Sequence, residues 1–173
     1  MSPSSSNSNN DYSLLLQSAK HLCTLFSNPH IPPTDLLALF TADAICHEHA
    51  TARLNSQIPF LARDLFPNEY FQLLGKLMSF QNMVFDEHEF WVDERKGVVG
   101  ARGRARFTWI GDGDDENEGE TREKSWDEIF VYRLEFAEAV EEVEVGRRKL
   151  KVRKVKKYEI WGDTGAMERA AKA

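Results

Sequence analysis

Two histidines, His47 and His49, lie two positions apart where the sequence predicts a strand over residues 41–48. Residues two apart on a strand share a face, so both imidazoles would point the same way and Glu48 the opposite way. Because histidine titrates near neutral pH, the pair could act as general acid and base if its face lines a pocket. The spacing also suits a metal, but no further ligands are marked by spacing and no metal is expected. The alternative is two inert, hydrogen-bonded side chains at a sheet edge.

Two carboxylates, Glu128 and Asp163, are the other candidates for acid–base chemistry. Glu128 shares a strand face with aromatic residues, whereas its neighbour Asp127 points to the other face. Asp163 follows the last aromatic strand. Apolar surroundings would raise the pKa of either carboxyl, because desolvation disfavours the anion. The alternatives are a surface position for Glu128, if the register is off by one residue, and an N-cap role for Asp163 before a helix from Ala166 onward.

Aromatic residues are more numerous than a small core needs, and they gather in the second half of the chain. A pocket for a flat, apolar ligand would use them, although the same residues could form core or a dimer face. The positions expected to bind a ligand are Phe60, Phe80, Trp109, Trp126, Phe130, Tyr132, Tyr158 and Trp161.

Composition limits the classes of protein to which the chain can belong. It has 173 residues, 42% of them hydrophobic, and a formal net charge of -6. That charge argues against a nucleic-acid partner, and the lack of a long apolar run argues against a membrane partner. Residues 11–167 are expected to form one domain, with a disordered tail at 1–10 and a C-terminal tail at 168–173. The N-terminus does not have the pattern of a signal peptide, so a cytoplasmic location is expected.

The pattern of elements, helices first and long strands afterwards, predicts an α+β fold. Helical spacing covers residues 12–26, and shorter helices are expected at 35–40 and from Pro67 onward. Strand alternation follows over 83–93, 99–109, 124–136 and 150–161, with a hairpin turn at Lys96-Gly97. The acidic insert at 111–123 is expected to be a solvated hairpin tip. In the insert at 137–149, acidic and basic arms are expected to face each other across a turn.

This order of elements, together with scattered signatures, resembles the SnoaL-like branch of the nuclear transport factor 2-like (NTF2-like) superfamily over residues 12–167. The chain is most similar to small fungal members, many without known function. The segments that carry the resemblance are Cys46-His47-Glu48-His49, Ser79-Phe80-Gln81-Asn82-Met83, Ala105-Arg106-Phe107-Thr108-Trp109, Ser125-Trp126-Asp127-Glu128 and Trp161-Gly162-Asp163.

The resemblance implies a cone, with three N-terminal helices packed in a strongly bent antiparallel sheet and a pocket at its open end. It also implies a homodimer formed through the outer face of the sheet. Members of the superfamily include cofactor-free isomerases, dehydratases and cyclases, and also pure binding or dimerising modules. In the enzymes a carboxylate inside the cone takes a proton next to a carbonyl, a role that Asp163 could fill, and a phenol such as that of Tyr132 can stabilise an oxyanion.

The sequence therefore predicts a protein that binds a small apolar metabolite and possesses an acid–base pair for isomerisation, cyclisation or dehydration without a cofactor. His47, His49, Glu128 and Asp163 are the candidates for that pair, and the hypothesis requires some of them to meet in one pocket. The alternative is a non-catalytic ligand-binding or dimerisation module. Phosphate-loop and Gly-X-Ser-X-Gly motifs are missing from the sequence, which argues against phosphoryl transfer and serine hydrolysis.

Overall fold

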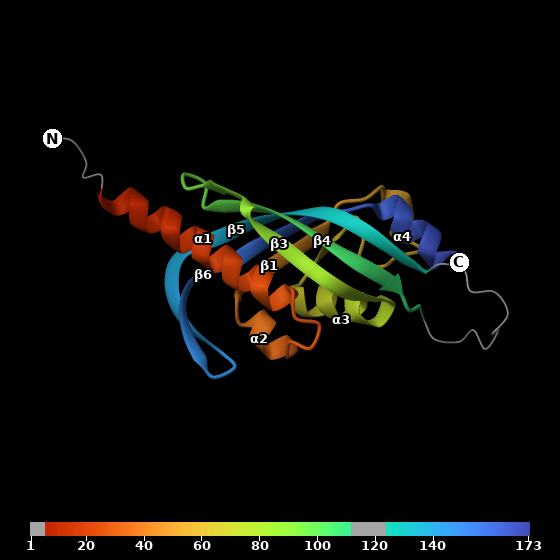
Figure 1. Cartoon of the computed structure of the whole chain (residues 1–173), viewed down its shortest axis with the longest axis horizontal. Coiled ribbons are helices and arrows are strands. Elements are labelled where there is room, and N and C mark those ends of the chain that lie inside the picture. The colour runs from red at the N-terminus through yellow and green to blue at the C-terminus, as the bar shows by residue number, and fades with distance from the viewer. Residues whose placement is uncertain (1–5, 112–123) are drawn as a thin grey trace.

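A mixed six-stranded sheet forms the body of the protein in the computed structural model, which describes residues 6–111 and 124–173 (Figure 1). The strands are β1 (Phe40–Glu48), β2 (Asp64–Leu65), β3 (Met78–Asp93), β4 (Val98–Trp109), β5 (Ser125–Val145) and β6 (Arg148–Trp161). They lie in the order β2-β1-β6-β5-β4-β3. All neighbours are antiparallel except β1 and β6, which run parallel.

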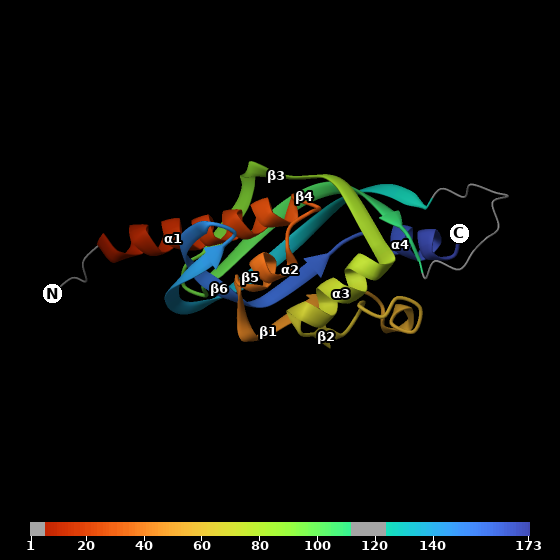
Figure 2. The ribbon, with the colours of Figure 1, turned by 90° about the horizontal axis from the view of Figure 1, so that it is seen from below.

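The helices are α1 (Ser6–Phe26), α2 (Pro33–Leu37), α3 (Pro67–Leu77) and α4 (Thr164–Ala171), and a 3-10 turn spans Ala52–Leu54. Helix α1 packs against β3, β4 and β6, and α3 packs against β1 and β3. Leu15, Ala19 and Leu22 of α1 are fully buried, as expected for an apolar face with helical spacing. Figures 1 and 2 show α1 along the sheet and α4 at the opposite end of the long axis from the start of α1.

Buried and more exposed side chains alternate along β4 and β5, so that most of the residues predicted for the inner face of each strand are buried. Val99 and Ala101 of β4 are fully buried, whereas Arg102, the next residue along the strand, is exposed. On β5, Glu128, Phe130, Tyr132 and Leu134 are all buried. The predicted inner face of β5 is therefore confirmed, and with it the inward orientation of Glu128.

The far ends of β5 and β6 form a long hairpin arm that curls away from the sheet toward α2 (Figure 1). Its turn uses Gly146 with a φ of 59°, a conformation that glycine adopts without steric cost. Lys149 pairs with Glu142 at 2.8 Å and Lys154 with Glu141 at 2.9 Å. The prediction that acidic and basic arms face each other is confirmed.

Three expectations about the architecture need correction. The first strand lies between α2 and α3 as expected, but a fourth helix at the C-terminal end of the described chain means that the helices are not confined to the N-terminal part. The sheet is mixed rather than antiparallel, since β1 and β6 are far apart in sequence and no tight hairpin fixes their relative direction. The expected tails are partly helical: α1 begins at Ser6, because an established helix extends at one hydrogen bond per added residue, and α4 continues to Ala171.

Two expectations concern residues that the structure does not describe. Residues 1–5 of the expected N-terminal tail, and residues 112–123 of the acidic insert, lie outside the described residues. No helix in the described part of the chain is long and apolar enough to cross a membrane.

Candidate acid–base site

A cavity of about 170 Å³ lies between the helices and the inner face of the sheet. Its wall comes from all four helices and from β1, β3, β4, β5 and β6, together with the segment between α1 and α2. Most of the wall is aliphatic or aromatic, and two carboxyl groups, those of Glu48 and Glu128, interrupt it. The aromatic residues of the wall are Phe26, Tyr70, Phe71, Phe80, Phe107, Phe130, Tyr132 and Tyr158.

Glu48 is the last residue of β1 and points inward beneath α3. Its side chain is buried, and the Tyr70 hydroxyl donates a hydrogen bond of 2.6 Å to its Oε2. Burial raises the pKa of Glu48 to about 7, and the negative charge of Glu128 adds to this rise while the Tyr70 hydrogen bond opposes it. Near neutral pH this carboxyl therefore exists in both its acid and its anionic forms.

Glu128 enters the cavity from β5 and is held at both carboxylate oxygens. The Trp126 indole N–H donates to Oε2 at 2.6 Å, and the backbone N–H of Asp163 donates to Oε1 at 3.0 Å. Burial raises the pKa of Glu128, and these two hydrogen bonds counteract part of the rise. Because Glu128 accepts two N–H donors and Glu48 only one hydroxyl, Glu128 is the better stabilised anion of the two.

Gly162 makes room for Glu128 at the end of β6. A Cβ atom at this position would lie 2.1 Å from Oε1 of Glu128, well inside van der Waals contact. The absence of a side chain here allows the carboxylate to reach the amide of the next residue, Asp163. The Trp161-Gly162-Asp163 segment thus positions Glu128 in two ways: Gly162 leaves space for its carboxylate, and the Asp163 N–H binds it.

Two further phenols, Tyr132 and Tyr158, line the cavity beside the carboxyls. Their rings meet edge to face with centroids 4.9 Å apart. Burial raises the pKa of both hydroxyls, so both remain protonated donors at neutral pH. Tyr132 lines the cavity, as the alternation of β5 predicts.

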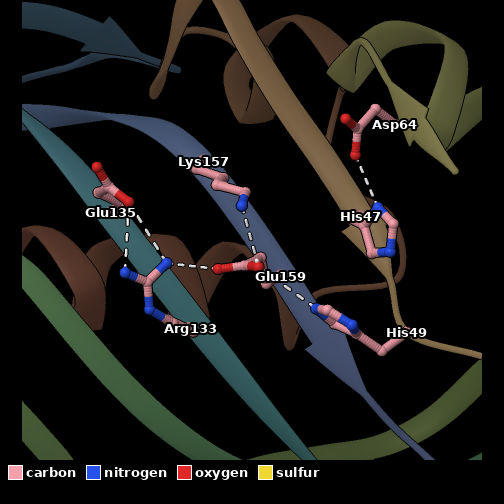
Figure 3. Close-up of polar contacts among 7 residues, drawn as sticks. All are labelled: His47, His49, Asp64, Arg133, Glu135, Lys157 and Glu159. Atoms are coloured by element: carbon pink, nitrogen blue, oxygen red, sulfur yellow. Dashed lines mark hydrogen bonds and ion pairs between the residues drawn. The ribbon is translucent and has the colours of Figure 1, made fainter. Parts of the chain in front are cut away.

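His47 and His49 lie on the outer face of the sheet and do not line the cavity (Figure 3). His47 Nδ1 lies 2.7 Å from Oδ1 of Asp64, and His49 Nε2 lies 3.3 Å from Oε1 of Glu159. The expected convergence of the two histidines with Glu128 does not occur. The reason is the alternation of β1, which turns Cys46 and Glu48 toward the core and the histidines away from it.

The histidines belong instead to a charged network on the outer face. Glu159 forms ion pairs with Arg133 and Lys157 and contacts His49, and Arg133 also pairs with Glu135 (Figure 3). Burial acts to raise the pKa of Glu159, but the hydrogen bonds from Lys157 and Arg133 outweigh it and lower the pKa overall. This carboxylate, unlike those in the cavity, is surrounded by cations.

Asp163 caps a helix and does not enter the cavity with its side chain. Its Oδ1 accepts a hydrogen bond of 2.9 Å from the backbone N–H of Ala166, at the start of α4. The capping alternative thus describes its side chain. Its backbone N–H nevertheless reaches Glu128, so the residue supports the site without facing it.

The eight aromatic residues expected to bind a ligand divide into two groups. Phe80, Phe130, Tyr132 and Tyr158 line the cavity. Of the others, Phe60 and Trp109 are buried elsewhere. Trp126 lies behind the wall, where it bonds to Glu128 and stacks on Phe107. Trp161 is exposed and stacks on His49 with centroids 4.1 Å apart. Tyr158 and Trp161 are separated by an odd number of strand positions, so they face opposite sides of β6.

The most important residues that sequence reasoning missed are Glu48 and Tyr70. The alternation of Ala44, Cys46 and Glu48 contains the signal for an inward Glu48, because the two smaller residues are typical of buried positions. Tyr70 lies one helical turn after the start of α3 and has no sequence link to β1. Among the described residues, no group of three or more His, Cys, Asp or Glu side chains is arranged to hold a metal ion.

Comparison with solved structures finds the same fold at low sequence identity. An NTF2-like protein of unknown function from Burkholderia pseudomallei is 15% identical, with 92% of this chain and 98% of that chain covered and a TM-score of 0.63. The BvnE pinacolase from Penicillium brevicompactum is 14% identical (92% and 93% covered, TM-score 0.61). PrhC from Penicillium brasilianum is 16% identical (92% and 87% covered, TM-score 0.59).

These likenesses show that the chain has the same fold as these solved structures, one of which is an NTF2-like protein. No protein-family model matches the sequence, and no curated protein sequence matches it significantly.

Proposed function

We propose that this chain, whose fold is NTF2-like, binds a small apolar metabolite in the cavity and transfers protons on it without a cofactor. The observation that supports the proposal is the presence of two buried carboxyls of raised pKa, Glu48 and Glu128, in one largely apolar cavity. Perturbed carboxyl pairs of this kind are typical of acid–base sites. The reaction class is isomerisation, cyclisation or dehydration.

The two carboxyls differ in a way that assigns their roles. Glu128, held as an anion by two N–H donors, is the general base that accepts a proton from a carbon next to a carbonyl. Glu48, with a pKa of about 7, is the general acid that returns a proton to oxygen or carbon. The phenols of Tyr132 and Tyr158, which line the cavity and share a hydrogen bond, are the proposed source of a hydrogen bond to a developing oxyanion. His47, His49 and the side chain of Asp163 have no part in this scheme.

The proposal is tested by deuterium exchange into an apolar ketone, beta-tetralone, followed by NMR in deuterated buffer. The wild type is expected to accelerate exchange at the carbon next to the carbonyl, and Glu128→Gln to abolish that acceleration. Glu138→Gln is the matched control, because Glu138 is exposed on the arm. If beta-tetralone binds but exchanges no faster than in buffer, the chain is the alternative, a non-catalytic binding module.

We further propose that the chain forms a homodimer through the outer face of the sheet. Ile129 and Val84 are 59% and 43% exposed on that face, beside the ion pair of Arg102 with Glu89. Exposed apolar side chains rimmed by charges are typical of interfaces. Sedimentation of the wild type and of Ile129→Asp tests this, with a shift from dimer to monomer as the expected result. A cytoplasmic location remains a prediction.

A further inference from the structure

The described side chains of the cavity wall that can carry a formal charge are all acids. Among the described residues of this wall, Glu48 and Glu128 are acidic, and none is lysine, arginine or histidine. The other titratable groups that interact with Glu48 are also acids: Tyr70 from α3, and Tyr132 and Glu128 from β5. The formal charges on the described side chains of the wall are therefore neutral or negative.

Neither cavity carboxyl takes part in an ion pair that the described residues form. Glu159 provides the contrast, because on the outer face it is matched by the cations Arg133 and Lys157. Buried carboxylates are normally paired with cations, since an unpaired one loses its hydration without compensation. The chain thus supplies counter-charges for a carboxylate outside the cavity, and its described residues supply none inside it.

The walls around the carboxyls are aromatic. Tyr70 and Phe71 approach within 5.2 Å between ring centroids, and Phe130 and Tyr132 within 4.8 Å. The faces of such rings are the negative pole of the ring quadrupole and attract ammonium groups, more strongly where water is excluded. Aromatic rings and carboxylates therefore favour the same sign of charge on a ligand.

We infer that the cavity selects a small hydrophobic amine, bound as its ammonium ion between Glu48 and Glu128, over a neutral or anionic molecule of the same shape. The inference goes beyond the proposed function and shares with it only that a small molecule occupies the cavity. The amine supplies the cation that the wall lacks, and its hydrocarbon part packs against the aromatic rings.

Binding of an ammonium ion favours the ionised form of both carboxyls and so releases protons. With a pKa of about 7, Glu48 is partly protonated at neutral pH and has a proton to release. A neutral ligand leaves the protonation unchanged, and an anionic ligand causes proton uptake. Proton release is thus a signature that apolar packing alone does not produce.

The test uses three probes of nearly equal shape: phenethylamine, phenethyl alcohol and phenylacetate. Titration calorimetry at pH 7 and pH 8, in buffers of different ionisation enthalpy, gives each affinity and the number of protons exchanged. We expect phenethylamine to bind about tenfold more tightly than phenethyl alcohol at pH 8, since hydrogen bonds to charged groups are worth more than neutral ones. We expect proton release at pH 7 with the amine alone.

Variants separate the carboxyls from the rest of the wall. Glu48→Gln and Glu128→Gln should each remove most of the preference for the amine, whereas Glu138→Gln on the exposed arm should retain it. Glu48→Gln should also abolish most of the proton release. The unmutated protein alone decides between the probes, so the test does not depend on the folding of a variant.

The outcomes distinguish this inference from the proposed function. Equal affinity for amine and alcohol, or amine binding without proton release at pH 7, overturns the inference and leaves ligand binding by the cavity intact. If none of the three probes binds, both the inference and the cavity-binding part of the proposed function are contradicted.

Discussion

The phenolic oxygen of Tyr70 on α3 lies 2.6 Å from Oε2 of Glu48 on β1, and both side chains are buried. Burial raises the pKa of Tyr70 well above its usual value, so the phenol donates and the carboxyl accepts. This hydrogen bond connects α3 to β1 in the cavity wall, which is otherwise largely apolar. It also provides Glu48 with its only side-chain hydrogen bond among the described contacts.

Tyr70→Phe tests the importance of this contact. Removal of the hydroxyl leaves a buried carboxylate without a partner, which should cost about 1–3 kcal/mol of unfolding free energy. The pKa of Glu48 should rise further, since the hydrogen bond lowers it. Denaturant unfolding at pH 8 measures the cost, with Tyr12→Phe on the exposed side of α1 as the control. Equal losses in the two variants would show that the hydrogen bond does not stabilise the fold.

Glu48 should also make the stability of the protein depend on pH. Its pKa is about 7 in the folded chain against 4.5 for an unperturbed carboxyl, so the folded state binds more protons between these values. Stability therefore falls as pH rises from about 4.5 to 7, and the full cost is present above 7. From the size of the shift, that cost is about 3 kcal/mol.

The measurement compares unfolding free energies of the wild type and Glu48→Gln from pH 5 to pH 8. Glutamine does not titrate, so the wild type should lose stability relative to the variant across this range. A difference that stays constant with pH would mean that Glu48 is not buried as an unpaired acid.

The steric relationship between Gly162 and Glu128 is open to a double-mutant cycle. Gly162→Ala places a methyl group where Oε1 of Glu128 lies, so it should displace the carboxylate and lower stability by about 1–3 kcal/mol. In a Glu128→Ala background the same change should cost less, with a coupling of about 0.5–3 kcal/mol.

Gly75→Ala is the control for this cycle. Gly75 lies in α3, where a methyl group would meet no described atom within 4 Å outside its own helix turn, and alanine in a helix gains about 0.5–1 kcal/mol over glycine. Additive effects of the Gly162 and Glu128 changes would contradict the proposed contact.

The histidines of β1 should be dispensable for the cavity. His47→Ala and His49→Ala remove partly exposed contacts to Asp64 and Glu159, so each should change stability by about 1 kcal/mol or less. The affinity for phenethylamine, measured by calorimetry, should match that of the wild type. A loss of affinity as large as that in Glu48→Gln would place the histidines in the binding site after all.

Much of the sheet could be predicted because β4 and β5 alternate cleanly. Their inner faces, including the inward direction of Glu128, follow from a period of two between small or aromatic residues and charged ones. The same reasoning failed on β1, where both faces have apolar residues. There the histidines, rather than Glu48, were assigned to the pocket face because of their chemistry. A buried glutamate opposes the usual burial preference, and only the partner on α3 explains it.

The last strand shows a second limit of pattern reasoning. Val152, Val155 and Tyr158 of β6 are all buried although they are three positions apart, and the pairing with β5 shifts in register along this part of the sheet. Such irregularities reset which residues face inward, so counting from Val152 across the register shifts does not give the face of Tyr158 or Trp161. Likewise, the contact between the Asp163 amide and Glu128 depends on a chain turn that alternation does not describe.

The parallel pairing of β1 with β6 has a consequence for how the protein acquires its structure. Glu48 on β1 is paired with Ile160 near the end of β6, and Glu128 is held by the amide of Asp163 just beyond it. Synthesis from the N-terminus therefore releases β1 long before its partner strand exists. Contacts between such distant segments close large loops and are reached late in folding. The contact between the Asp163 amide and Glu128, and the pairing of Glu48 with Ile160, therefore form only after the last strand has been made.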